Sequence, residues 1–277
     1  MASNGSIQGL SVWSGSAPAA FAATVLGDLD IDTNAFEKEG VGGQVVVGKG
    51  TTTTKLSLTD VIGVTAAHAQ MWFPTTAGLQ PANFPDFIVT TGTKQFTLED
   101  GSPGSGTVSM SEGDGFLTMA LEAGFAKVTP ATAAATHVYA SVAGDTNNTI
   151  VAQLGAADFG CKSFEIANNG GWENVNAMDT KAEGSQTAPL GVISTLKLPT
   201  VSCVLDDEID TAGLLADAYT GANLVLSGNL YTITVTGIAQ SSFQGKLQDA
   251  SGVTSYSYKF TLVSGTIYNR VTIAAVT

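Results

Sequence analysis

Apolar and polar residues alternate in short runs along most of the chain, a pattern typical of β-strands that bury one face. Phe116–Leu121 and Tyr256–Leu262 alternate most regularly. The runs are rich in β-branched residues and are separated by Gly, Ser and Asn, so the sequence predicts a mainly all-β fold. Further strands are expected at residues 11–32, Lys55–Val64, Phe87–Val89, Phe96–Leu98, His137–Val142, Leu154–Ile166 and Tyr231–Thr236. Gly101–Gly106 is expected to form a turn.

Two short helices interrupt this pattern. Thr65 is suited to cap a helix over Ala66–Phe73, which the next residue, a proline, ends. Thr211–Tyr219 is amphipathic, with acidic residues before its first turn, where the helix dipole favours them, and Gly221 after its last. The two helices fall at comparable places in the two halves of the chain, which indicates an internal repeat.

A short, gapped repeat supports this interpretation. The dipeptide Glu39–Gly40 recurs as Glu183–Gly184. The Leu-x-Leu motif at Leu56–Leu58 recurs at Leu196–Leu198, with a shorter loop before it. Both spacings are close to half of the 277 residues, so we expect two related domains in tandem.

The boundary between these domains is expected at residues 128–136, which are small, weakly charged and contain a proline. The domains would then span residues 1–127 and 137–277. Each is expected to be a β-sandwich or partly closed barrel with one short flanking α-helix and a long β-hairpin loop.

The first of these loops, residues 36–54, contains five glycines and is too long for a tight turn. Loops of this length in a compact domain are usually functional or disordered. Val45–Val47 and Thr51–Thr54 could pair as the arms of a hairpin.

Composition and charge narrow the function. The chain is 44% apolar and only 13% charged, so it is expected to fold. Its 24 acidic and 11 basic residues give a net charge of −13, which argues against a protein that grips nucleic acid. The same charge would suit a surface past which DNA slides without sticking. The first residues resemble no secretory signal, and no apolar run is long enough to span a membrane.

Candidate catalytic groups are few, and we expect no enzyme, no cofactor and no metal. His68 and His137 have no cysteine or carboxylate at motif spacing, which favours structural or surface roles. Cys161 and Cys203 could form one disulfide, although two buried thiols are favoured. Asp206–Asp210 could supply half of a calcium site, but the acidic start of a helix is the favoured interpretation.

Acidic residues also alternate with apolar ones on an early strand. Asp28, Asp30 and Asp32 should share one face, opposite Leu29 and Ile31. For a single chain a solvated strand face is the favoured interpretation. The alternative is an acidic surface that lines a cavity in an assembly.

Taken together, the acidic strand, the long Gly/Thr hairpin loop, the flanking helix and the small-residue N-terminus resemble the phage major tail tube protein family, here with a duplicated tube domain. The resemblance implies a structural virion protein whose domains join their sheets into stacked rings around a lumen. Two-domain members assemble as trimers, other tail proteins are partners, and DNA passes only as cargo. The protein would be made in the host cytoplasm and located in the phage tail, without a membrane.

The resemblance also assigns roles to residues. The strands around Leu117–Leu121 and Tyr256–Leu262 would join copies within a ring. Asp28, Asp30, Asp32 and Glu173 are the candidate lumen acids. The candidate inter-ring stacking loops contain Phe36, Glu39, Gly40, Val45, Val46, Val47, Thr52, Met178, Glu183, Gly184 and Leu190.

Two other classes of function stay open. A capsid decoration protein or a tail-fibre or surface-binding β-sandwich would also be acidic and rich in Gly and Thr. A carbohydrate-binding or hydrolytic β-sandwich would need an aromatic platform or two suitably spaced carboxylates. Trp13, Trp72 and Trp172 are scattered in the sequence and do not indicate such a platform.

Overall fold

The protein is almost entirely β-structure, which confirms the expected fold class. The description comes from a computed structural model. Within the described residues, seventeen strands accompany one short helix, α1 (Ala66–Gln70). These residues are 3–39, 45–75, 84–92, 94–111, 116–131, 136–141, 150–155, 157–175, 191–195, 197–205, 221–248, 254–263 and 266–276.

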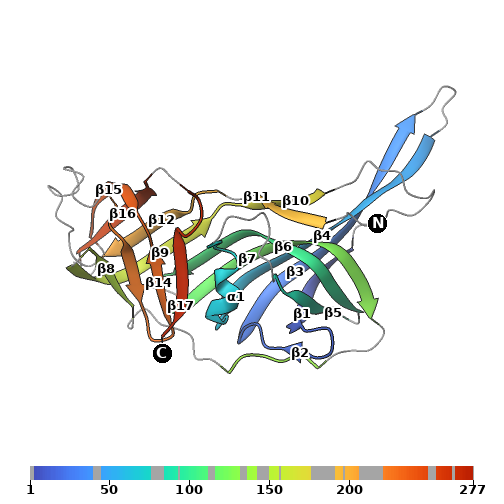
Figure 1. Cartoon of the computed structure of the whole chain (residues 1–277), viewed down its shortest axis with the longest axis horizontal. Coiled ribbons are helices and arrows are strands. Elements are labelled where there is room, and N and C mark those ends of the chain that lie inside the picture. Colours follow the sequence, from blue (N-terminus) through green and yellow to red (C-terminus); the bar gives the residue numbers. More distant parts are fainter. Residues whose placement is uncertain are drawn as a thin grey trace.

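The first half forms a closed six-stranded barrel (Figure 1). Each strand pairs antiparallel with the next, and β5 returns to β1. Alternate side chains fill the interior because successive residues of a strand point to opposite faces. The order around the barrel is β1 (Ser3–Trp13), β3 (Thr24–Glu39), β4 (Val45–Ile62), β7 (Leu117–Ala131), β6 (Lys94–Met110) and β5 (Asp86–Thr91), and the short β2 (Pro18–Ala19) pairs with β1.

The second half repeats this pairing order with shorter strands. Among the described residues β14 and β15 are not paired with each other; the chain passes from one to the other across Gly237, whose φ is 72°. The order is β8 (Val151–Leu154), β9 (Ala157–Asn168), β12 (Thr200–Leu205), β16 (Thr254–Leu262), β15 (Ile238–Gln248), β14 (Tyr231–Val235) and β13 (Leu224–Ser227), and β17 (Val271–Ala275) adds to β14.

Rows of buried residues show which strands of the two halves correspond to each other. In the first half Leu29, Leu56 and Ala123 lie side by side on β3, β4 and β7. In the second half Ile166, Val201 and Phe260 lie side by side on β9, β12 and β16 and are equally buried. The shared pairing order supports the interpretation of an internal repeat, while the division into separate domains stays a prediction.

Two long hairpins occupy equivalent places in the two halves. The first is β3–β4, paired from Thr24 opposite Ile62 out to Glu39 opposite Val45. In the second, β10 (Gly171–Val175) and β11 (Gly191–Thr195) pair with each other and follow the β9–β12 pairing after a short break. Ile166 and Val201 are paired at the base of the second hairpin, as Leu29 and Leu56 are at the base of the first. The chain between the paired residues is longer in the second hairpin, so the expectation of a shorter second loop is wrong.

The two halves are joined by backbone pairing and by a common core. Gly106–Met110 of β6 pair with Asn168–Phe164 of β9, so one sheet runs from the first half into the second. One hydrophobic cluster contains residues of both halves. Helix α1 also bridges them, because the Gln70 amide donates to Val271 O (3.0 Å) and accepts from Ile273 N (2.6 Å) on β17.

Three local expectations need correction. Residues 128–131 end β7 and pair with β6, so they belong to the barrel and not to a linker. Residues 101–106, expected to form a turn, lie inside β6, where glycines make room for aromatic rings: a Cβ at Gly101 would lie 2.4 Å from Phe125, and one at Gly106 would lie 2.7 Å from Trp72. The helix begins after Thr65 as expected but ends at Gln70, three residues early, as Met71 N turns to bond His68 O (3.1 Å).

The expected strand at His137–Val142 is absent from the described residues 136–141. Instead His137 fastens this segment to the first barrel, with its ring nitrogens 3.2 Å from Ser11 Oγ and 2.8 Å from Thr90 Oγ1. The ring fits there because position 9 is glycine, where a Cβ would lie 2.2 Å from it. These side-chain contacts hold the segment where a strand was expected. The second expected helix, Thr211–Tyr219, lies outside the described residues.

Candidate functional site: a polar sheet face and two adjacent hairpins

One continuous sheet dominates the molecule and spans both halves. Its strands follow the hydrogen-bonded order β3–β4–β7–β6–β9–β12–β16–β15. We call the face that points away from the buried core of both halves the polar wall. One row across its middle contains Thr118, Ser109, Glu165, Ser202 and Lys259 on successive strands.

The polar wall carries the acidic strand that the sequence singled out. Asp28 and Asp32 are exposed and Asp30 is half-buried, while Leu29 between them is buried, so the alternation holds. Glu165 adds an exposed carboxylate in the second half. Lys55 lies opposite Asp30 in the pairing register, but its ammonium contacts Glu122 Oε2 at 2.7 Å.

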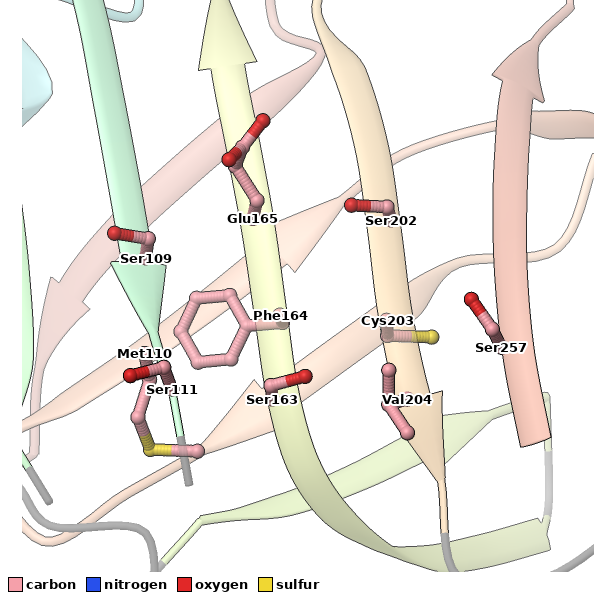
Figure 2. A pocket seen from close by; sticks show the side chains of 10 residues that line it. All are labelled: Ser109, Met110, Ser111, Ser163, Phe164, Glu165, Ser202, Cys203, Val204 and Ser257. Atoms are coloured by element: carbon pink, nitrogen blue, oxygen red, sulfur yellow. The ribbon is translucent and has the colours of Figure 1, made fainter. Parts of the chain in front are cut away.

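A shallow groove of about 330 Å³ follows this face at the join between the halves (Figure 2). Ser109, Ser163, Ser202 and Ser257 line it from β6, β9, β12 and β16, together with Glu165. The groove therefore offers many weak hydrogen-bonding groups and one negative charge, an arrangement with few strong contacts for an anionic polymer.

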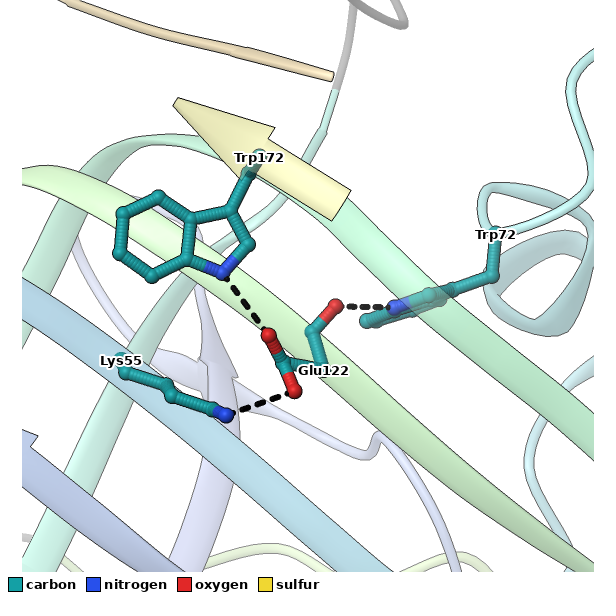
Figure 3. Close-up of polar contacts among 4 residues, drawn as sticks. All are labelled: Lys55, Trp72, Glu122 and Trp172. Carbon is teal, nitrogen blue, oxygen red and sulfur yellow. Dashed lines mark hydrogen bonds and ion pairs between the residues drawn. The ribbon is translucent and has the colours of Figure 1, made fainter. Parts of the chain in front are cut away.

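The second hairpin docks on the first barrel through Trp172. A Cβ at Gly124 would lie 2.3 Å from this ring and one at Gly104 would lie 2.8 Å from it, so the two glycines form the seat. Trp172 Nε1 donates to Glu122 Oε1 at 3.2 Å. Trp72 approaches the same residue from the barrel interior and donates to Glu122 O at 2.7 Å (Figure 3).

The same docking brings the two hairpins side by side. Asn174 Nδ2 of β10 donates to Thr53 Oγ1 of β4 at 3.2 Å. Figure 1 shows β10 and β11 crossing β6 and β7 toward the base of the projecting β3–β4 arm. Ser194 of β11 adds a buried contact, 2.6 Å from Ser102 Oγ.

Not all candidate residues lie together. Glu173 is exposed but lies between Trp172 and Asn174, both of which face the first barrel, so it points away from the polar wall. In the first hairpin, the candidate stacking residues Phe36, Glu39, Val45, Val46, Val47 and Thr52 belong to the paired arms. Gly40, Met178, Glu183, Gly184 and Leu190 lie outside the described residues.

The strands expected to join copies within a ring have no edge to offer at those residues. Leu121 of β7 pairs with Leu58 of β4 and with Gly106 of β6. Tyr258 of β16 pairs with Cys203 of β12 and with Phe243 of β15. Both strands lie inside the sheet, so any joining of sheets between copies must use its outermost strands.

The histidines and cysteines have structural surroundings. His68 Nδ1 lies 2.8 Å from the helix-capping hydroxyl of Thr65, and burial lowers the pKa of His68, as it does that of His137. Cys161 and Cys203 are buried thiols, as favoured from the sequence. Burial, and secondarily Cys161, raises the pKa of Cys203. In the described part of the chain, no three His, Cys, Asp or Glu side chains gather where a metal ion could bind. The acidic stretch Asp206–Asp210 lies outside that part.

Comparison of the sequence with models of known protein families and with curated proteins found no match. Among the described residues, no helix has the length and apolar character needed to cross a membrane.

Two features were not predicted from the sequence: the packing of Trp172 on Gly104 and Gly124, and the row of polar side chains across the sheet that contains Glu165. The sequence predicted a strand at Leu154–Ile166, which contains Glu165, but the alternation carries no information about which strand lies beside it. Gly104 and Gly124 carried a signal in principle, since glycine inside a strand often marks a close approach.

Proposed function

We propose that the protein is a non-enzymatic structural protein that assembles with itself into stacked rings, which form the tube of a phage tail and conduct DNA. The observation that carries the proposal is the polar wall, one face of an eight-stranded sheet that is continuous through both halves, with the β10–β11 hairpin packed on part of it in the first half. A sheet of this extent, repeated around an axis, would form the inner surface of a tube.

The chemistry of the polar wall suits a conduit. DNA binds proteins mainly through lysine and arginine contacts with its phosphates. Among the described residues, the polar wall carries exposed Asp28, Asp32 and Glu165 against one exposed lysine, Lys259, since its Lys55 is paired with Glu122. The whole chain has a net charge of −13. Such a surface would repel a passing duplex weakly along its length and leave it free to move.

The hairpins suit contacts between successive rings. A two-stranded ribbon is at best marginally stable alone in water, so the projecting β3–β4 arm would gain order from a partner surface. Asn174 and Thr53 hold the two hairpins together at one end of the molecule, so both could reach the same neighbouring ring. Trp172, seated on Gly124, fixes the position of the second hairpin.

Electron microscopy of the purified chain across protein and salt concentrations tests the proposal. Hollow tubes, or rings with a central hole, are the expected result. A monomer under all conditions would contradict the proposal and favour a decoration or surface-binding protein, which binds a shell and forms no tubes.

A further inference from the structure

The polar wall ends in two strands, β3 and β15. Within the part of the chain that the structure describes, β15 pairs from Gln240 to Gln248 with β16 alone. At the other end, Asp28–Ile31 of β3 pair with β4 on one edge and with Ser3–Ser6 on the other. Among the described residues, the sheet thus has one edge without a partner strand and one edge covered by the N-terminal arm, which we define as Ser3–Ser6.

The pairing of β6 with β9, which joins the two halves, shows how two edges of this kind pair within one chain. Ile166 of β9 pairs with Val201 of β12 on one side and with Val108 of β6 on the other. In the first half Leu29 takes the place of Ile166, so the equivalent edge of β3 is the one that the N-terminal arm covers.

β15 occupies in the second half the position that β6, which pairs with β9, occupies in the first half. Ser109 of β6 lies opposite Thr118 of β7, five residues before Ala123. Leu247 of β15 lies opposite Ser255 of β16, five residues before Phe260. Ala123 and Phe260 occupy equivalent rows, so Leu247 takes the place of Ser109. Ser109 pairs with Glu165 where the two halves join. Leu247 takes the place of Ser109, and Asp28 takes the place of Glu165. The equivalent pairing between two chains therefore places Leu247 of one chain opposite Asp28 of the other.

We propose that β15 of one copy pairs with β3 of the next, with Leu247 opposite Asp28, after displacing the N-terminal arm. The inference rests on the proposed self-assembly and specifies its joint and its regulation. The two edges differ, so the contact is head-to-tail and continues into a closed ring or a helical filament. An uncovered edge strand is a ready template for such pairing.

The composition and the pairing of the N-terminal arm favour its displacement from β3. Its residues are Ser, Asn, Gly and Ser, with no large apolar side chain to hold it. β1 pairs with β3 as far as Ser6 and with β5 from Ile7 onward, and the β1–β5 register is irregular between Ile7 and Gly9. The arm can therefore detach before Ile7 while the rest of β1 keeps its partner. While it remains in place it blocks assembly, and a neighbouring chain must compete with it.

Disulfide trapping tests the register in the full chain. Asp28→Cys combined with Leu247→Cys places two cysteines opposite each other, at a Cα separation that a disulfide accepts. Mild oxidation should give a ladder of covalent multimers, because each chain carries one of each partner. The matched control, Asp32→Cys with Leu247→Cys, displaces one cysteine by about 13 Å along β3 and should give no ladder. Cys161 and Cys203 are buried and should not contribute.

Deleting residues 2–6 tests the blocking role. The deletion should lower the protein concentration at which rings or tubes appear, by at least several-fold. Tubes that yield no covalent ladder in the Asp28→Cys/Leu247→Cys variant, or an unchanged threshold after the deletion, would overturn the joint and leave the proposed function standing. A monomer in every variant, including the deletion, would overturn both.

Discussion

Gly124→Ala should loosen the second hairpin from the first barrel by colliding with Trp172. The new Cβ would lie 2.3, 2.4 and 2.8 Å from three atoms of the indole ring, whereas ordinary contacts begin at 3.4 Å. The ring must therefore retreat by about 1 Å and give up part of its packing. Overpacking of this kind costs roughly 1–3 kcal/mol, and we expect about 2 kcal/mol because Trp172 is only half-buried and can move outward.

A double-mutant cycle separates this collision from other effects. The Trp172→Ala background removes the three atoms nearest to a Cβ at position 124, and alanine should then stabilise the strand by about 0.5–1 kcal/mol relative to glycine. Gly191→Ala is the matched control in the same hairpin, because open space surrounds a Cβ there, and it should change stability by less than about 0.5 kcal/mol.

Urea denaturation followed by tryptophan fluorescence gives the free energies of unfolding, and electron microscopy reports assembly. Gly124→Ala should lose stability and form fewer tubes, and Gly191→Ala should do neither. An equal cost of Gly124→Ala in both backgrounds would refute the docking of Trp172 on Gly124.

Three further predictions follow from single sites. Thr54→Val should raise the free energy of unfolding by about 1 kcal/mol, since the buried Thr54 hydroxyl has no hydrogen-bond partner within the described residues; a loss of stability in urea would contradict this. Burial lowers the pKa of His68 and His137, so their contribution to stability is present above the unfolded pKa of about 6.5 and falls as pH drops below it. The double variant His68→Gln/His137→Gln should therefore lose less stability than the native chain between pH 7 and pH 5, and an equal loss would contradict it. Replacing residues 34–51 by Asn-Gly keeps Thr33 opposite Thr52 beside a tight turn, and should give a folded chain with unchanged melting temperature that no longer forms tubes; normal tubes would contradict the stacking role of the arm.

The sequence was sufficient for those features that depend on local patterns. Alternation predicted most strands, and the Thr65 cap predicted the start of α1. Asp28, Asp30 and Asp32 were placed on one face because a strand has a period of two residues. The long hairpin at β3–β4 followed from its glycines and β-branched residues.

Features that depend on contacts distant in the sequence could not be predicted. Nothing in the Ser109 or Glu165 segments specifies that β6 and β9 pair, because small polar residues match many partners. The glycines of residues 101–106 suggested a turn, whereas they admit Phe125, Trp172 and Trp72 into the sheet. His137 was expected in a strand, but its two hydroxyl partners hold that segment in another conformation.

The most direct test of the central claim is negative-stain electron microscopy of the purified native chain, with mass photometry of the same sample. We expect hollow tubes or rings with a central hole, and ring masses of three or six chains, three being expected if the two halves act as repeated units. We also expect more assembly at higher salt, which screens repulsion between chains of net charge −13. A monomer at every protein and salt concentration, both for the native chain and after deletion of residues 2–6, would contradict the central claim.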